Sequence, residues 1–287
     1  MIRYTIENAI NQRCLMKRRF VAAALTAAIV MGLELRAWGQ NVTPESLGSS
    51  DLIMTGAGED RRATGIGFFV EVPSQRFKGQ SFVYLVTARH VLLDGTGKPL
   101  GQMSFVIGRG KGGAAVSSTL PPAEQWFYDP HDRYADLAAL PFSPKGVEFT
   151  TVPIKSVLEG SGAENLGADA YYVALLSDAA DSAPVMTVHF GRVSVADPVA
   201  GSVPGAGSQR LCFLEGLSAP QLSGSPVYIR GADRIWLWGL IEAKSSMEAA
   251  QGGGASGMIG VLPAEKIAET VKAMAAAQDR RRTGAGL

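Results

Sequence analysis

Short apolar runs separated by polar, glycine-rich turns make up most of this chain. The runs are rich in β-branched and aromatic residues, which favour strands. Strands are therefore expected at residues 65–72, 81–87, 102–107, 170–176, 185–196, 209–214, 226–229 and 235–243. The segment 185–196 alternates apolar and polar positions, which fits either one long strand or a hairpin around Gly191. The pattern predicts an all-β protein.

One stretch, residues 263–277, has helical periodicity instead. Pro263 suits the first position of a helix, where no amide hydrogen is needed. Ile267, Val271 and Met274 recur at helical spacing, so one apolar face is expected to pack on the body of the protein.

The N-terminal forty residues have the layout of a secretory signal peptide. A basic cluster at residues 17–19 precedes an uncharged apolar run at residues 20–33, and the small-residue ending at residues 37–39 precedes Gln40. Met16 lies directly before the basic cluster and is a second candidate for the true start of the chain. The alternative is an uncleaved membrane anchor, but the apolar run is short for a bilayer span.

The expected organisation is two antiparallel β-barrels of the six-stranded type followed by a C-terminal α-helix. The predicted segments are a signal peptide at 1–39, a linker or loosely docked arm at 40–62, the N-terminal barrel at 63–145, the C-terminal barrel at 146–262, the helix at 263–279 and a frayed tail at 280–287.

Composition narrows the possible partners and cofactors. The chain has 287 residues, is 46% hydrophobic and carries a formal net charge of +1, which is globular and gives no basis for binding nucleic acid. No membrane contact is expected once the signal peptide is removed. After that removal Cys212 is the single thiol, so no intramolecular disulfide forms, and its apolar surroundings predict a buried, inert thiol. The three His and two Cys have no metal-ligand spacing, so neither metal nor cofactor is expected.

The segment 221–226, Gln-Leu-Ser-Gly-Ser-Pro, is the strongest candidate for chemistry. Gly224 allows a tight turn that leaves the Ser223 hydroxyl unobstructed. By itself the segment fits an ordinary hairpin turn equally well. A serine nucleophile also needs a base and a group that orients the base.

The chain contains candidates for both. His90, His131 and His189 all precede Ser223, which excludes the α/β-hydrolase order and permits the order His, Asp, Ser. His90 follows a buried strand and is the best-held base, whereas His131 lies in a charged loop and His189 on a strand face. Asp136 precedes an apolar strand and can be buried against an imidazole. Asp129 and Asp132 compete with it but lie in polar sequence.

Residues 87–91, 136–140 and 222–226 together resemble the three signature blocks of trypsin-like (chymotrypsin-fold) serine peptidases, especially bacterial members. The resemblance covers roughly residues 62 to 277. It implies that His90 is the general base, Asp136 orients His90 and Ser223 is the nucleophile. It also implies an oxyanion hole made by the backbone amides of Gln221 and Ser223.

Three residues depart from the family pattern. Gln221 stands where the family has a glycine, and a side chain restricts the backbone at that position of the oxyanion loop. Leu222 replaces the usual aspartate, so no trypsin-style activation by a freed N-terminus is expected. Glu242 replaces a small residue near the triad aspartate, where it either holds His90 differently or faces solvent.

The substrate pocket implied by the resemblance contains Leu217, Ser218, Glu242 and Lys244. No acid occupies the pocket base, so cleavage after Arg or Lys is not expected. An apolar or small substrate side chain fits Leu217, whereas Lys244 favours an acidic one.

Two functions follow from these residues. The first is an exported, periplasmic or secreted serine endopeptidase that acts on protein or peptide through an acyl-enzyme. The second is a trypsin-like fold that serves as a protein-binding module with little turnover. The sequence gives no indication of oligomeric state.

Overall fold

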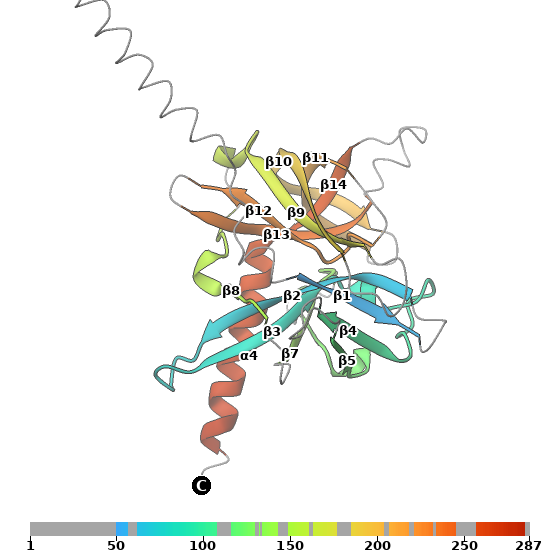
Figure 1. Ribbon diagram of the computed structural model, residues 1–287. Coiled ribbons are helices and arrows are strands. Elements are labelled where there is room, and N and C mark those ends of the chain that lie inside the picture. The colour runs from blue at the N-terminus through green and yellow to red at the C-terminus, as the bar shows by residue number, and fades with distance from the viewer. Residues whose placement is uncertain are drawn as a thin grey trace, which may run out of the picture. The chain divides into compact units, whose positions relative to one another are not determined.

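A computed structural model of the chain (Figure 1) describes most of the region after the predicted signal peptide. The described residues are 50–56, 62–107, 116–129, 132, 134–142, 149–160, 163–176, 185–203, 207–217, 221–231, 234–244 and 257–284. The predicted signal peptide lies outside them. No helix within the described residues is long and apolar enough to cross a membrane.

The first half of the chain forms an eight-stranded sheet. Seven strands follow the order β5-β4-β1-β2-β3-β7-β6, and β8 pairs with β2. The strands are β1 (Ser50–Thr55), β2 (Arg62–Pro73), β3 (Ser81–Thr87), β4 (Met103–Ile107), β5 (Val116–Leu120), β6 (Phe127–Tyr128), β7 (Ala138–Pro141) and β8 (Val152–Pro153). The sheet curves into a half-barrel.

Aromatic side chains fill the interior of this sheet. Phe69 on β2 is fully buried, and the centre of its ring lies 5.3 Å from that of Phe105 on β4. Phe142, just after β7, stacks on the same ring, and Phe149, before β8, packs against it at a tilt. These contacts gather β2, β4 and the segments next to β7 and β8 around one aromatic centre.

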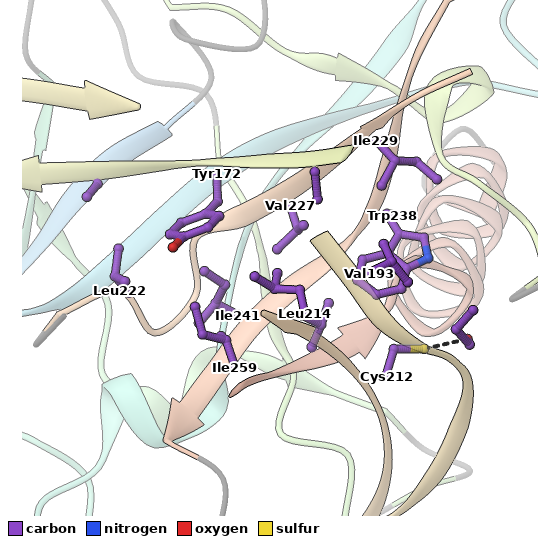
Figure 2. Close-up of a cluster of buried hydrophobic side chains, with 14 residues drawn as sticks. Tyr172, Val193, Cys212, Leu214, Leu222, Val227, Ile229, Trp238, Ile241 and Ile259 are labelled. Carbon is purple, nitrogen blue, oxygen red and sulfur yellow. Dashed lines mark hydrogen bonds between the residues drawn. The ribbon is translucent and has the colours of Figure 1, made fainter. Parts of the chain in front are cut away.

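The second half is a closed six-stranded barrel in the order β10-β11-β14-β13-β12-β9. Its strands are β9 (Asp169–Leu176), β10 (Val185–Val203), β11 (Gly207–Gly216), β12 (Pro226–Arg230), β13 (Ile235–Lys244) and β14 (Met258–Pro263). Every strand contributes buried side chains to one core, and Figure 2 shows Leu222 joining that core from outside the strands. The segment expected as a strand or hairpin near Gly191 is one long strand, β10.

Helix α4 (Ala264–Gly284) is the one α-helix in the described part of the chain. It packs on β13 and β14 of the barrel and on β2 and β3 of the sheet (Figure 1). Its apolar face, including the predicted Ile267, Val271 and Met274, is buried. The all-β fold with a C-terminal helix is therefore confirmed, with one closed barrel and one half-barrel.

Several predicted boundaries differ from the structure. Residues 50–55, predicted as part of a linker, form β1, which is buried between β2 and β4 because their open edges pair with it. Residues 152–153 pair with β2 and so belong to the first sheet rather than to the second barrel. Residues 280–284 are helical rather than a frayed tail, because Asp279 and Arg282 contact the first sheet.

Candidate active site

His90 lies in a single 3₁₀ turn, Arg89–Leu92, that follows β3 after one extended residue. The sequence predicted it at the end of the strand itself. The turn forms because Val91 and Leu92 are buried and because the Arg89 amide donates to the Asp136 carbonyl at 3.2 Å. The His90 side chain remains 27% exposed, so part of the imidazole is open to solvent.

Asp136 is buried directly beneath His90. Its Oδ1 accepts a hydrogen bond from the His90 amide at 2.7 Å, and its Oδ2 is hydrogen-bonded to His90 Nδ1. Burial by itself would raise the pKa of Asp136, but the hydrogen bonds and charge of His90 hold that pKa below its ordinary value. An ionised Asp136 keeps the imidazole proton on Nδ1, which leaves Nε2 with a lone pair.

Ser223 lies in a turn whose backbone is hydrogen-bonded to both halves of the chain. Its carbonyl accepts from the Ile66 amide on β2 at 2.9 Å, and the Gly224 amide donates to the Ile241 carbonyl on β13 at 2.7 Å. The next residue, Ser225, is buried, and its hydroxyl donates to the Val173 carbonyl. The turn therefore has little freedom to move relative to either sheet.

Gly224 brings the Ser223 turn against the strand that leads to His90. Its φ is +86°, and a Cβ there would lie 2.1 Å from the Ile66 carbonyl oxygen and 2.5 Å from Thr87 Oγ1. Ala88, two residues before His90, is the next nearest neighbour. Only glycine allows this close approach, so the turn depends on Gly224 as the sequence predicted.

Gln221 takes a backbone conformation that favours glycine. Its φ is +70°, and it is the one non-glycine residue with positive φ among those the structure describes. Leu222 beside it is buried in the barrel core (Figure 2), which anchors this side of the turn. The Ser223 amide has no hydrogen bond to another described residue. Gln221 therefore has the positive φ typical of glycine at the position where the trypsin-like family has a glycine, although Gln221 carries a side chain.

Glu242 is not in an open substrate pocket, contrary to the sequence-based expectation. It is 1% exposed because it points from β13 into the interface behind Asp136. Gln209 of β11 joins the two acids: its Nε2 donates to Glu242 Oε2 at 2.8 Å, and its Oε1 accepts from the Asp136 amide at 2.9 Å. Burial raises the pKa of Glu242 well above its ordinary value, and the charge of Asp136 raises it further.

Among the described residues, His90, Asp136 and Glu242 are the one group of three whose potential metal-ligand atoms all lie within 4.8 Å of one another. The hydrogen bond between His90 Nδ1 and Asp136 already uses one atom of each. Both carboxyl groups are buried, and hydrogen bonds account for the contacts of Asp136 with His90 and of Glu242 with Gln209. We therefore interpret the group as a hydrogen-bonded chain.

Two other residues of the predicted pocket, Leu217 and Lys244, lie just after β11 and at the end of β13. Leu217 is 62% exposed, and its carbonyl accepts from the buried Tyr172 hydroxyl at 2.6 Å. Lys244 is the last residue of β13 and pairs with Ile259. Ser218 lies outside the described residues.

The alternative candidates do not join this site in the structure. Asp129 Oδ1 accepts from the Asp132 amide, so these acids shape their own loop. His189 stacks on Tyr172, and His131 lies outside the described residues. Cys212 is the predicted buried thiol: its Sγ donates to the Ala196 carbonyl, and burial raises the pKa of the thiol to about 12.

Comparison with known proteins identifies the fold. The structure is similar to the active form of the Rv3671c protease from M. tuberculosis, with a TM-score of 0.50, 14% sequence identity, and coverage of 79% of this chain and 81% of that one. An inactive mutant form of Rv3671c gives a TM-score of 0.50 at 13% identity, covering 84% and 93%. The fold is that of trypsin-like serine proteases. No protein-family model and no curated protein matches the chain in sequence.

At this level of identity the trypsin-like fold is shared, while the chemistry has to be argued from the residues. The candidate site lies between two β units, the half-barrel sheet and the closed barrel. In this chain His90 and Asp136 come from the first unit, whereas Ser223 and Glu242 come from the second. Gln209, which the sequence did not single out, crosses between the units. Its position at the start of an apolar strand was the available signal.

Proposed function

We propose that this protein is an exported serine endopeptidase that cleaves protein or peptide substrates. The observation that carries the proposal is the buried Asp136 carboxyl group, hydrogen-bonded to both the amide and Nδ1 of His90. That arrangement is required when an imidazole accepts a proton at Nε2. The Ser223 turn, held against the strand that leads to His90, supplies the hydroxyl.

In the proposed reaction the Ser223 Oγ attacks the substrate carbonyl carbon while its proton passes to His90 Nε2. The carbonyl π electrons move to the oxygen, which the amides of Gln221 and Ser223 then stabilise. The tetrahedral species collapses and breaks the C–N bond, and His90 returns the proton to the leaving amine. Water repeats the sequence on the acyl-enzyme and releases the acid and free Ser223.

Export is part of the proposal and rests on the sequence. The basic cluster at residues 17–19, the apolar run at 20–33 and the small-residue ending at 37–39 are in the order that signal peptidases recognise. N-terminal sequencing of the protein recovered from its native source tests this part. A mature chain that begins at Gln40 supports export, and an intact first segment contradicts it.

Hydrolysis of an unfolded protein substrate tests the peptidase activity. Mass spectrometry of the products should show new peptide termini with the parent protein, and Ser223→Ala should lower the rate by about 10³-fold or more. Ser194→Ala is the matched control, because that exposed hydroxyl on β10 bonds only its own strand at the Arg192 carbonyl. Cleavage that survives Ser223→Ala would contradict the proposal.

A further inference from the structure

A second acid lies buried behind the proposed triad. Asp136 and Glu242 are each 1% exposed, and both are held by the same Gln209 side chain. Atoms of the two carboxyl groups lie within 4.8 Å of each other. Two ionised carboxylates that close would repel strongly, because burial removes the screening that bulk water provides. The arrangement therefore requires a proton on one of the two acids.

The hydrogen-bond directions show which acid holds the proton. A backbone N–H can only donate, so the Asp136 amide fixes Oε1 of Gln209 toward Asp136 and its NH₂ toward Glu242. Oε2 of Glu242 is therefore an acceptor. Oδ1 and Oδ2 of Asp136 both meet nitrogen donors of His90. Both oxygens of the Asp136 carboxylate are therefore acceptors.

The other Glu242 oxygen completes the pattern. Oε1 is buried and has no hydrogen-bond donor among the described residues. A buried, bare carboxylate oxygen is costly, whereas a carboxylic O–H at that position has an acceptor in the neighbouring Asp136. Of the His, Cys, Asp and Glu side chains that the structure describes, those of His90 and Asp136 each place a polar atom within 4.8 Å of a Glu242 carboxyl oxygen.

We propose that Glu242 is an uncharged carboxylic acid whose O–H donates to Asp136 and, together with Gln209, positions that carboxylate beneath His90. This inference rests on the proposed function for its effect on activity. Glu242 does not touch substrate, so it is a positioning residue. As a neutral donor it leaves a single negative charge behind the imidazole while adding a hydrogen bond to Asp136. Burial, which raises the pKa of Glu242, is consistent with this state at neutral pH.

Two substitutions separate the neutral donor from a charged Glu242. Glu242→Leu removes the donor and leaves the Gln209 amide without its acceptor. Glu242→Gln keeps an N–H donor for Asp136 and a carbonyl acceptor for Gln209 but has no charge at any pH. Glu71→Gln on β2, a carboxylate paired with Thr151, is the matched control.

The readout is the rate of fluorophosphonate labelling of the full chain as a function of pH. Glu242→Leu should label about tenfold more slowly or worse, because a hydrogen bond to a charged group is lost. Glu242→Gln should restore most of that loss with the same pH midpoint as the parent. A midpoint that falls in Glu242→Gln would show that a charge was removed, and a Leu variant that labels like the parent would show no positioning role. Either result overturns the inference.

Infrared difference spectroscopy tests the proton without reference to activity. The difference between the parent and Glu242→Gln at neutral pH should contain the carbonyl stretch of a protonated carboxylic acid. Its absence overturns the inference even if the parent labels well. If the band is present but the parent fails to label, the proposed function fails and the assignment of the proton stands. The Leu variant is not needed for this measurement, so misfolding of that variant cannot obscure the result.

Discussion

At the scale of single residues, Gln221 carries backbone strain at the proposed site. A side chain in the left-handed region costs about 1 kcal/mol relative to glycine. The buried Leu222 on one side and the fastened Ser223 turn on the other hold Gln221 in that conformation. Strain that the surroundings enforce is typical of functional sites. The glycine-like geometry supports the proposed oxyanion role of this amide.

Two substitutions at Gln221 test that role. Gln221→Pro removes the amide hydrogen and forces negative φ, so labelling of Ser223 should slow by about 10²–10³-fold, the cost of one oxyanion donor. Gln221→Gly retains the amide and permits positive φ, so it should label far faster than the proline variant. Equal labelling of both variants would show that the amide does not take part.

The raised pKa of Glu242 predicts a pH-dependent cost to stability. Folded Glu242 keeps its proton at a pH where the unfolded residue, with an ordinary pKa of 4.5, has lost it. Stability therefore falls as pH rises from 4.5 toward the folded pKa, by up to about 1.4 kcal/mol per pH unit, and levels off above it. Glu242→Gln lacks this loss, so it should gain stability over the parent as pH rises.

Denaturant unfolding, repeated at steps of about one pH unit between roughly pH 4 and 8, measures the difference in unfolding free energy between the parent and Glu242→Gln. The parent and Glu242→Gln should be closest at the acid end, where Glu242 is protonated in both the folded and unfolded states. A difference that is constant across the range would mean that Glu242 has an ordinary pKa in the folded protein.

Sequence alone predicts part of this site and not the rest. His90, Asp136 and Ser223 lie in short stretches whose residue types fit one chemistry in one order. Glu242 and Gln209 lie in strands, and strand alternation does not tell which interface each polar side chain enters. Their approach to Asp136 depends on how the two halves pack together, which no local pattern encodes.

At the scale of elements, helix α4 connects the sheet and the barrel, because it packs on strands of both. Near its end, Asp279 is 4% exposed and accepts from the Ser74 hydroxyl at 2.6 Å and from the Gln75 amide at 3.0 Å. The Tyr84 hydroxyl donates to Gln278 on the adjacent position. These contacts extend the ordered helix beyond its last apolar turn.

Removing the Asp279 carboxylate should weaken the packing of α4 on the sheet. Asp279→Ala leaves the Ser74 hydroxyl and Gln75 amide without this acceptor, so the free energy of unfolding should fall by about 1–3 kcal/mol. Glu269→Ala on the exposed face of α4 removes only a solvent-exposed pair with Lys266 and should cost about 0.5 kcal/mol or less. Denaturant unfolding compares the two variants. Equal losses of stability would contradict a role for Asp279 in holding α4 on the sheet.

The apolar strands were predicted well because their pattern is strong, and the weaker strands were missed for identifiable reasons. β1 begins with the buried polar residues Ser50 and Asp51, which hide its strand character. β5 is a sheet edge whose Ser117 and Thr119 face outward, so it has the composition of a loop. β14 runs directly into α4 and ends at Pro263, which the sequence pattern places at the start of the helix instead.

At the scale of the whole molecule, the site exists only where the two halves meet. The Ile66 amide of the sheet binds the Ser223 carbonyl of the barrel turn, and the Asp136 amide of the first half binds Gln209 of the second. Each half holds only part of the proposed triad. Damage to this interface should therefore affect activity before it unfolds either half.

Covalent labelling with a fluorophosphonate, read by intact mass, tests the proposed triad. The probe reacts with an activated serine and requires no knowledge of the substrate. The parent protein should gain a single adduct that is absent from Ser223→Ala and His90→Ala, with all three proteins folded by circular dichroism. A folded parent that gains no adduct, or an adduct that persists in Ser223→Ala, would contradict a working His90, Asp136 and Ser223 triad.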